Sequence, residues 1–278
     1  MRHLRVLVDS VDEKGLVHKI SGVFYENGLN MVSNSEFVDH ASEKFFMRSI
    51  VDGEVDVARL KDALAKVLPQ GSNIKVLKPK KKNIVLMATK EIHAIGDILI
   101  RYEAGELEAN IVGVISNHSE LEGFVRKFGL PYYTISAEAL SREAHEKLVL
   151  ERLESFGEID YIVLAKYMRI LTPEFVRCYE DKLINIHHSF LPAFIGANPY
   201  KQAYERGVKI IGATAHFVNN DLDDGPIIAQ EVVHVNHAYD YKDMQKYGRD
   251  VEKVVLSRAL KLALEDRIFV YNNKTVIF

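Results

Sequence analysis

The sequence predicts an α/β protein in which a small βαββαβ domain is followed by a doubly wound, mainly parallel sheet. Two observations support this fold class. Residues 1–78 contain four short apolar runs and two helical patterns in the order of the split βαβ motif. From Asn83 onward, continuous apolar runs alternate with helical patterns, as expected for strands that are buried by helices on both faces. The length of 278 residues allows two such domains.

The first domain is predicted element by element from its apolar spacing. Residues 4–8 alternate apolar and polar side chains, as in a half-buried strand, and residues 12–27 have the apolar spacing of a helix that ends at Asn27-Gly28. Two strands around a turn at 40–44, a helix at 57–67 and a strand at 74–77 complete it. Its two helices cover only one face of the sheet, so we expect a homo-oligomer, a dimer or a tetramer.

A short basic linker at 79–82 leads into the second domain at 83–278. We expect its strands at 84–88, 109–115, 132–135, 161–165, 183–186, 210–218 and 227–235. We expect helices at 95–102, after Ser119, at 141–156, at 173–178 and at 241–265, and a hairpin at 270–276. The helix at 141–156 is predicted to be amphipathic.

Charge and composition argue against several classes of partner. The net charge of −3 and the pI of about 6.4 give no global basic field for nucleic acid. The single cysteine, Cys178, excludes an internal disulfide and fits a reducing compartment. The sequence shows no signal peptide and no apolar run of membrane-spanning length. We therefore expect a cytoplasmic protein with no membrane or nucleic-acid partner.

Two segments in the second half carry chemically useful side chains at the ends of apolar runs. Residues 184–192 read INIHHSFLP, and residues 212–228 read GATAHFVNNDLDDGPII. Asn185 can donate a hydrogen bond to an oxyanion, His187 can stabilise or protonate it, and Asp223 can hold a histidine charged or accept a proton from water. Together they suit acyl transfer, although each alone could simply end a strand or form a turn.

Both segments resemble the signature of the folate-dependent formyltransferases. In that family an Asn, a His and an Asp form the catalytic trio, which the motif match places at Asn185, His187 and Asp223. Residues 164–171 resemble the strand and loop that line the family's pterin pocket. The resemblance implies folate contacts at Met168, Arg169, Leu171, His188 and His216. Ordinary core packing for Met168 and Leu171, and a peripheral position for His188, remain alternatives.

The resemblance is closest, over nearly the whole chain, to the branch of the family that hydrolyses 10-formyltetrahydrofolate to formate and tetrahydrofolate. The run at 187–196 and the region at 201–215 carry it. It implies neither a metal nor a cofactor. The first domain, with DEKGLV at 12–17, resembles an ACT domain, which implies an amino-acid effector, glycine or methionine, near Gly15 and Asn30. A tight helix entry at Gly15 is the alternative.

The first strand of the second domain argues against a phosphorylated acceptor. No glycine lies between Ala88 and Gly96, whereas a phosphate site at a strand end needs glycines that let backbone N–H groups approach the anion. Glu91 would repel a phosphate, so the acceptor side is expected to be empty and open to water. A formyltransferase with an unphosphorylated acceptor, such as an amino sugar, and a catalytically silent sensor remain alternatives.

Metal-dependent hydrolysis and a serine nucleophile fit the sequence less well. The pairs His187-His188 and His234…His237 lack the i, i+4 spacing of a helical zinc site. If His187 and His188 both belong to a strand, they point to opposite faces of the sheet. Ser189 lacks the Gly-x-Ser-x-Gly elbow of a serine hydrolase.

Overall fold

A computed structural model describes residues 3–194 and 198–278 and divides the chain into two compact units. Unit 1 contains Met1–Lys80, Asp266–Phe269 and Val276–Phe278, and unit 2 contains Lys81–Glu265 and Val270–Thr275. Ile195 and Gly196, which belong to the motif at 187–196, lie outside the described residues.

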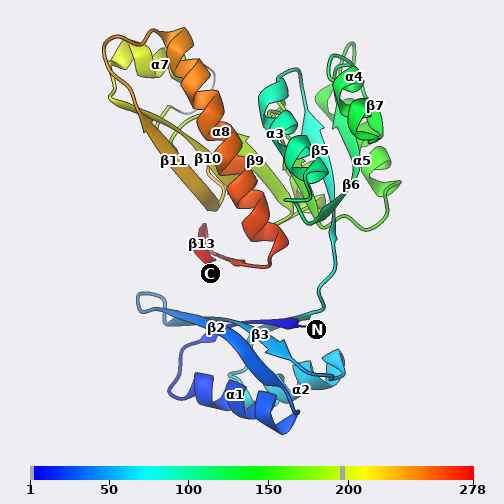
Figure 1. The fold of residues 1–278 in the computed structure, drawn as a ribbon, viewed down its shortest axis with the longest axis vertical. Helices are drawn as coiled ribbons and strands as arrows, with labels where there is room; N and C mark the ends of the chain where they lie inside the picture. Colours follow the sequence, from blue (N-terminus) through cyan, green and yellow to red (C-terminus); the bar gives the residue numbers. More distant parts are fainter. Residues whose placement is uncertain (1–2, 195–197) are drawn as a thin grey trace. The chain divides into compact units, whose positions relative to one another are not determined.

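Unit 1 is built on a four-stranded antiparallel sheet with the strand order β2-β3-β1-β4 (Figure 1). Its elements are β1 (Leu4–Val11), α1 (Leu16–Glu26), β2 (Asn30–Asp39), β3 (Lys44–Asp52), α2 (Val57–Val67) and β4 (Asn73–Leu77). Both helices pack on one face, where their apolar residues join those of β1 and β3 in a single core. The predicted βαββαβ order is confirmed.

The first helix begins later than the sequence pattern suggested. Gly15 stands at its N-cap with a φ of 90°, a left-handed conformation that favours glycine, and the helix starts at Leu16. Leu16, Ile20 and Phe24, which define the helical spacing, are all buried in the core. The apolar spacing therefore located the buried face correctly, and the backbone requirement of Gly15 determined where the helix begins.

The second face of the unit 1 sheet is partly covered by the C-terminal segment of the same chain. The ring of Phe46 on β3 meets Phe269 edge-on, with 5.6 Å between centroids. Arg5 on β1 forms an ion pair of 2.8 Å with Asp266, whose backbone carbonyl also accepts a hydrogen bond from Arg48. Since the chain itself supplies this cover, the open-face argument for a second subunit is weaker than the sequence suggested.

Unit 2 is built on a seven-stranded sheet with the order β11-β10-β9-β8-β5-β6-β7 (Figure 1). The strands are β5 (Lys82–Ala88), β6 (Ala109–Ser116), β7 (Tyr132–Thr134), β8 (Tyr161–Leu164), β9 (Leu183–His187), β10 (Ile210–Phe217) and β11 (Ile227–His234). The pairs among β5 to β9 are parallel, while β10 runs antiparallel to both β9 and β11. This confirms the predicted mainly parallel sheet.

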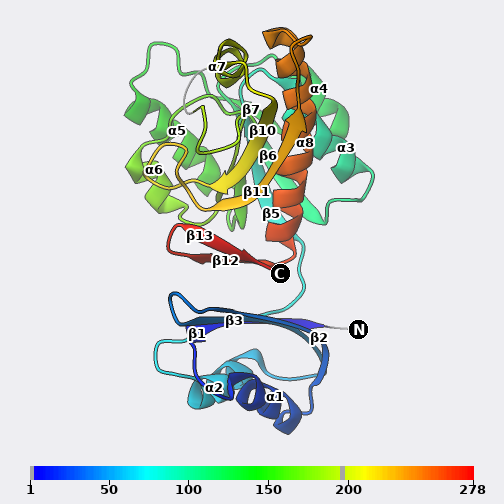
Figure 2. The same cartoon turned by 90° about the vertical axis from the view of Figure 1, so that its left-hand side faces the viewer.

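Helices cover both faces of the unit 2 sheet. They are α3 (Ile92–Glu103), α4 (Glu122–Val125), the 3-10 turn η1 (Arg126–Phe128), α5 (Arg142–Glu154), α6 (Pro173–Cys178), α7 (Pro199–Arg206) and α8 (Tyr241–Leu264). α5 and α6 lie on one side of the sheet, and α3 and α8 lie on the other (Figure 2). β12 (Ile268–Tyr271) and β13 (Lys274–Ile277) form the C-terminal hairpin. Among the described residues, no helix is long and apolar enough to cross a membrane.

Two helices depart from the sequence expectation. α7 was not predicted, although Pro199 in its first turn and Gly207 at its C-cap are ordinary helix signals. α5 buries His145 and Glu146 beside Val149 and Leu153, so its buried face is half polar rather than apolar. The helix is therefore only weakly amphipathic. Hydrogen bonds of its buried polar side chains, as well as apolar contacts, hold it against the rest of the unit.

The sheet order creates a switch point between β5 and β8. From β5 the chain first builds outward through β6 and β7, and then returns to add β8 and β9 on the other side. The loops that leave β5 and β8 therefore diverge, and such a position is where open α/β sheets form ligand sites. Here the two loops remain joined by one hydrogen bond of 2.9 Å, donated by the backbone N–H of Met168 to Thr89 Oγ1.

Candidate active site

A pocket of about 300 Å³ lies at the carboxyl ends of β8 and β9 and under the loop between β10 and β11. Eight residues singled out in the sequence line it: Met168, Arg169, Leu171, Asn185, His187, His188, His216 and Asp223. We refer to it as the strand-end pocket. Gly15 and Asn30 are not part of it, since both belong to unit 1.

The antiparallel pairing of β9 and β10 positions Asn185. Asn185 lies directly opposite His216 in the register, and its Nδ2 is 3.2 Å from His216 Nε2. His216 Nδ1 is 2.8 Å from the carbonyl oxygen of Phe217, so it carries the hydrogen and leaves Nε2 as an acceptor. Burial lowers the pKa of His216, which keeps it neutral. His216 thus accepts one hydrogen of the Asn185 amide and leaves the other available to a ligand.

His187 and Asp223 form the second polar pair of the pocket. His187 lies two residues after Asn185 on β9, on the same face of the strand. Its Nδ1 is 3.2 Å from Asp223 Oδ1, and both side chains are almost fully buried. The other ring nitrogen, Nε2, is buried and has no hydrogen-bond partner among the described residues. A buried polar atom without a hydrogen-bond partner destabilises the fold unless a ligand or a water molecule forms that hydrogen bond.

Close packing fixes the loop that carries Asp223. Asp223 has a φ of 57°, a left-handed conformation that Asp tolerates better than most residues. A Cβ added at Gly225 would lie 1.7 Å from the carbonyl oxygen of Phe217, so only glycine allows the loop to lie this close to β10. On its outer side, the carbonyl of Asp224 accepts a hydrogen bond of 2.6 Å from Asn273.

Two opposing effects set the charge of Asp223. Burial of its carboxyl raises the pKa, but the hydrogen bond and the charge of His187 lower it by more. The net pKa lies below its ordinary value, so Asp223 is ionised at neutral pH. An ionised carboxylate beside an imidazole is suited to accept a proton or to hold the imidazole in one orientation.

His188 differs from the sequence expectation. β9 ends at His187, so the strand rule that would turn His188 to the opposite face does not apply. Both histidines line the strand-end pocket, with 5.3 Å between their ring centroids. Burial and the nearby Lys166 lower the pKa of His188 to about 4. It is therefore a neutral imidazole inside the pocket, not a peripheral residue.

The loop after β8 forms the apolar wall of the pocket. Met168 is 56% exposed, which rules out ordinary core packing, whereas Leu171 packs against the edge of the core. Thr172, at the end of the loop, donates both its backbone N–H and its hydroxyl to the buried Glu146 of α5. This explains why α5 buries a carboxylate: Glu146 anchors the end of the loop.

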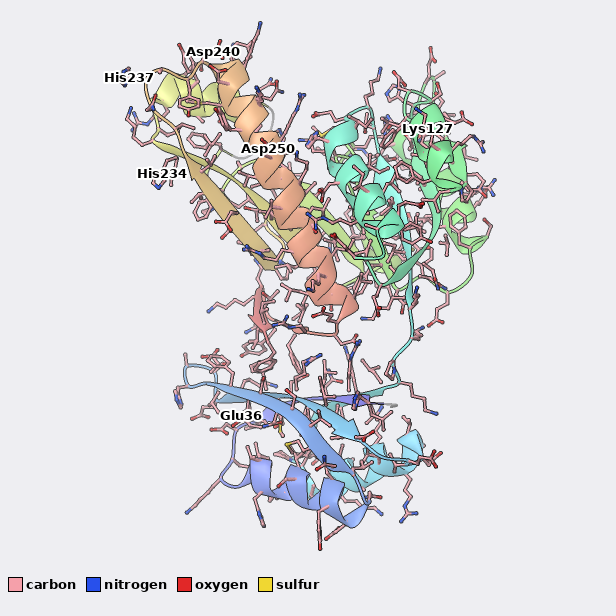
Figure 3. All side chains as sticks on the ribbon, viewed as in Figure 1. Glu36, Lys127, His234, His237, Asp240 and Asp250 are labelled. Atoms are coloured by element: carbon pink, nitrogen blue, oxygen red, sulfur yellow. The ribbon has the colours of Figure 1, made fainter. Side chains whose placement is uncertain are left out.

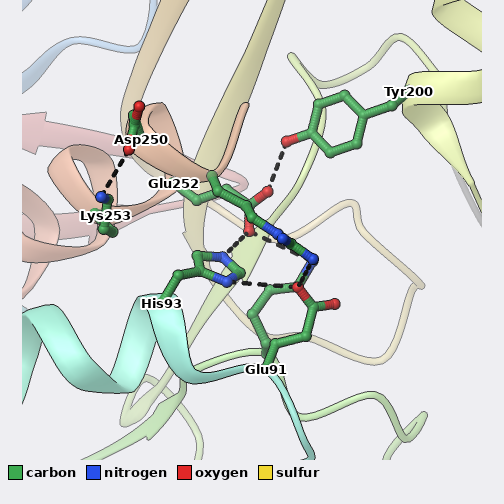
Figure 4. Close-up of polar contacts among 8 residues, drawn as sticks. Glu91, His93, Tyr200, Asp250, Glu252 and Lys253 are labelled. Carbon is green, nitrogen blue, oxygen red and sulfur yellow. Dashed lines mark hydrogen bonds and ion pairs between the residues drawn. The ribbon is translucent and has the colours of Figure 1, made fainter. Parts of the chain in front are cut away.

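A second cavity, of about 420 Å³, adjoins the strand-end pocket and shares Lys166, Met168 and His188 with it. Glu252 of α8 lies in its wall and is 1% exposed. Its carboxylate is 2.6 Å from Tyr200 Oη, 2.8 Å from His93 Nε2 and 3.4 Å from Lys166 Nζ, and we call these four residues the Glu252 cluster (Figure 4). The cluster could not be predicted from local sequence, because its members come from three helices and the loop after β8.

The charge of Glu91 is not isolated in this second cavity. Its carboxylate lies 3.5 Å from the guanidinium of Arg249 and 3.4 Å from the His93 ring, so the charge of Arg249 offsets the repulsion that the sequence suggested (Figure 4). The charged side chains of the Glu252 cluster form part of the wall of this acceptor side. The cavity extends beside His188, which lines it.

The other candidate groups lie apart from this chemistry. Among the described residues, no group of three or more His, Cys, Asp or Glu side chains is arranged to hold a metal ion. His234 and His237 are exposed at the end of β11 and in the loop after it (Figure 3). The Ser189 hydroxyl is buried and donates a hydrogen bond to the Ala193 carbonyl, so it is held as a structural contact.

Sequence comparison matches both units to known families. Residues 82–260 match the Formyl transferase family, and residues 4–69 match the ACT domain family. The chain is 53% identical over 272 residues to a formyltetrahydrofolate deformylase of Haemophilus influenzae, covering 98% of each chain. It is 51% identical over 267 residues to the deformylase of Escherichia coli strain K12, covering 96% of this chain and 95% of the other.

Structural comparison agrees. The crystal structure of a formyltetrahydrofolate deformylase from Pseudomonas syringae superposes with a TM-score of 0.95 at 40% identity, covering 100% of this chain and 95% of the other. A glycinamide ribonucleotide transformylase from Symbiobacterium toebii gives 0.69 at 28% identity and covers 76% of this chain and 100% of its own. This chain, with its ACT domain and its Formyl transferase domain, therefore belongs to the formyltetrahydrofolate deformylase family.

Proposed function

We propose that this protein hydrolyses 10-formyltetrahydrofolate to formate and tetrahydrofolate in the strand-end pocket. The observation that carries the proposal is the buried, unpartnered Nε2 of His187, which Asp223 orients from the other side of the ring. A formyl oxygen that becomes an oxyanion supplies the missing partner. The family membership of the chain supports the same substrate.

In this proposal the pterin lies against the loop after β8. Backbone polar groups of residues 167–171 recognise its polar edge, because they keep fixed positions and carry no charge. The N–H groups of Met168 and Arg169 are not among them, since they donate to Thr89 Oγ1 and to the Tyr167 carbonyl. The exposed thioether of Met168 and the side chain of Leu171 give apolar contact, and Arg169 lies beside them in the lining. The formyl group then reaches Asn185 and His187 at the ends of the strands.

The reaction passes through a tetrahedral intermediate. The oxygen of a water molecule bonds to the formyl carbon, and Asp223 takes one of its protons directly or through His187. The amide of Asn185, held by His216, and the imidazole of His187 stabilise the oxyanion. The C–N10 bond then breaks, the proton passes to N10 of the folate, and formate leaves. No metal and no cofactor other than the folate substrate takes part.

The alternative is transfer of the formyl group to an unphosphorylated amine, such as an amino sugar. The second cavity beside His188 has room for a small acceptor. Its wall, however, holds the ionised Glu252 and Lys166 in a closed set of contacts instead of leaving them free to bind a sugar. Hydrolysis requires only water in that space, so we favour the hydrolase.

We also propose a regulatory role for unit 1 and a cellular setting for the enzyme. An amino acid, glycine or methionine, binds near Gly15 and Asn30 in the ACT domain and controls turnover, since unrestrained hydrolysis would deplete one-carbon units. The enzyme acts in the cytoplasm as a homo-oligomer, a dimer or a tetramer. The formate that it releases supplies purine synthesis and balances the one-carbon folate pool.

The decisive experiment measures formate release from 10-formyltetrahydrofolate with no added acceptor. We expect the wild type to release formate and Asp223→Asn to lose most turnover while it keeps its fold. Asp250→Asn makes the same chemical change at an exposed position of α8, outside both cavities, and is expected to stay active. Formate release only when an amine is supplied would favour the transferase, and normal turnover of Asp223→Asn would remove this site from the mechanism.

A further inference from the structure

The second cavity contains a group that the proposed mechanism leaves without a role. His188 lines both this cavity and the strand-end pocket, so it stands where the two spaces meet. Its ring lies 5.3 Å from that of His187 and 5.9 Å from that of Tyr200. Beyond these ring contacts, His188 makes no hydrogen bond or ion pair with any described residue. Its nitrogens are therefore available to a molecule in the cavity.

The cavity is polar enough to hold water. Glu252 and Lys166 are both buried and charged in its wall, and Glu91 and Arg249 form a further ion pair there. Water occupies a cavity when several polar partners and sufficient volume are present, and both conditions hold here. The cavity shares Lys166, Met168 and His188 with the pocket that Asn185, His187 and Asp223 line.

The Glu252 cluster holds the wall on which His188 rests. Tyr200 donates its hydroxyl hydrogen to Glu252 at 2.6 Å, and the ring of Tyr200 packs against His188. Gly248 permits this approach, because a Cβ at that position would lie 2.1 Å from Tyr200 Oη. Glu252 is thus connected to His188 through one intermediate side chain, that of Tyr200.

We propose that the attacking water is held at the mouth of the second cavity by His188, which accepts a hydrogen bond from it, and that the Glu252 cluster positions His188 through Tyr200. The inference rests on the proposed hydrolysis and adds the origin and the orientation of the water. In this assignment His188 is a catalytic residue, because it touches the reacting water, and Tyr200 and Glu252 are positioning residues.

The proton balance follows from this arrangement. One hydrogen of the water points to His188 and stays on the oxygen, while the other is transferred to Asp223 as the oxygen bonds to the formyl carbon. The transferred proton then passes to N10 as the C–N10 bond breaks, and the formic acid formed loses its remaining proton to solvent. The lowered pKa of His188, about 4, means that its ring is neutral and able to accept a hydrogen bond at physiological pH.

The test replaces His188 by Phe, which keeps a ring of similar size and removes both nitrogens. We expect His188→Phe to reduce kcat for formate release by about a hundredfold with little change in KM. Hydroxylamine is a stronger nucleophile that depends less on an oriented hydrogen bond, so adding it should restore turnover of this variant by forming formohydroxamate. His237→Phe is the matched control, since His237 is exposed outside the site, and it should behave as the wild type (Figure 3).

A second variant covers the case in which His188→Phe does not fold. Tyr200→Phe keeps the ring against His188 and removes only the hydrogen bond to Glu252. It should lower kcat for formate release more than it lowers turnover with hydroxylamine. Unchanged formate release in either folded variant, or an equal loss with both nucleophiles, would overturn the proposal.

Failure of the inference is distinguishable from failure of the proposed function. If the wild type releases no formate without an acceptor, the hydrolase itself is wrong. If the wild type and the His237→Phe control hydrolyse the substrate normally and hydroxylamine fails to rescue His188→Phe, hydrolysis stands and only the water site assigned to His188 is wrong.

Discussion

At the scale of single residues, the site depends on which hydrogen-bond donor or acceptor each polar group directs into the pocket. Asn185 has a useful free hydrogen only because His216 accepts the other one, and His216 is an acceptor because its second nitrogen donates to the Phe217 carbonyl. Burial keeps His216 neutral, so that one of its ring nitrogens remains an acceptor for the Asn185 amide. A histidine that the sequence suggested as a folate contact therefore also serves to orient the Asn185 amide.

Asn185→Ala should reduce kcat by about a hundredfold or more, because one preorganised oxyanion donor is lost. KM should change much less, since the donor acts mainly in the transition state. Steady-state formate release measures both. Asn110→Ala, which alters an exposed asparagine on β6 outside the pocket, is the control. A rise in KM with normal kcat would show that Asn185 binds the substrate instead of stabilising the oxyanion.

At the scale of elements, the loop between β10 and β11 places the carboxylate of Asp223. Gly225 lets this loop lie against Phe217, and Asp223 is only two residues away. The length of β10 and the missing side chain of Gly225 thus determine the distance between the carboxylate and His187. The DDGP sequence alone predicts an ordinary turn. Its contact with β10, which places Asp223 beside His187, is apparent only in the folded structure.

Gly225→Ala should displace the loop, because its Cβ would fall 1.7 Å from the Phe217 carbonyl oxygen. We expect at least a tenfold loss of kcat and a destabilisation of about 1–3 kcal/mol, as is usual when a well-packed position receives extra atoms. Gly123→Ala is the matched control, since nothing lies within 4 Å of a Cβ at that exposed position. Equal behaviour of the two variants in formate release and urea unfolding would contradict this account.

Helix α8 contributes a buried charge that makes stability depend on pH. Burial raises the pKa of Glu252, but the hydrogen bond from His93 and the charge of Lys166 outweigh it and lower the pKa from 4.5 to about 2. When a carboxyl group has a lower pKa in the folded state than in the unfolded state, its ionised form stabilises the fold at pH values above the unfolded-state pKa. This stabilisation is lost as the pH falls through the folded-state pKa. The ionised form of Glu252 therefore stabilises the fold above about pH 4.5, and this stabilisation is lost between about pH 4.5 and 2.

Glu252→Gln should lower the free energy of unfolding by about 3 kcal/mol at pH 7, because the buried Lys166 loses its partner. The difference from the wild type should shrink as the pH falls toward 3. Urea titrations at pH 7 and at pH 3 give both values. Asp250→Asn, which alters an exposed carboxylate of the same helix, is the control (Figure 4). A difference that stays constant with pH would show that charge is not the cause.

At the scale of the whole molecule, the C-terminal hairpin belongs to both units. Its base, Asp266–Phe269 with Val276–Phe278, groups with unit 1, and Val270–Thr275 groups with unit 2. Within unit 1, Asp266 pairs with Arg5 of β1. Within unit 2, Asn273 donates to the carbonyl of Asp224, the residue next to Asp223. The tip of the hairpin therefore contacts the loop that carries Asp223 through Asn273.

Asn273→Ala should free the outer side of the loop that carries Asp223 and reduce kcat by about tenfold, the effect of losing roughly 1.4 kcal/mol of transition-state stabilisation. Lys274→Ala, an exposed change at the neighbouring position of the same hairpin, should leave kcat unchanged. Formate release by the two variants, compared at equal folate saturation, decides the matter. Equal rates would show that the loop keeps its position without the hairpin.

The sequence by itself determined the fold class, the order of the elements except α7, and three polar residues of the strand-end pocket: Asn185, His187 and Asp223. These follow from local properties: apolar spacing distinguishes strands from helices, and the chemical types at 185, 187 and 223 stand next to such runs. It also indicated which residues of α1 are buried. It gave no sign of the contact between Glu146 and Thr172, since helix α5 then looks simply amphipathic.

Only the tertiary structure decided how these groups are oriented and what surrounds them. The Glu252 cluster joins residues 93, 166, 200 and 252, and the register of β9 with β10 sets Asn185 against His216. Both depend on contacts between segments far apart in the chain, which no local spacing encodes. The physical reason is that a side chain's charge and hydrogen bonds depend on its burial and its neighbours, and the packed fold alone supplies these.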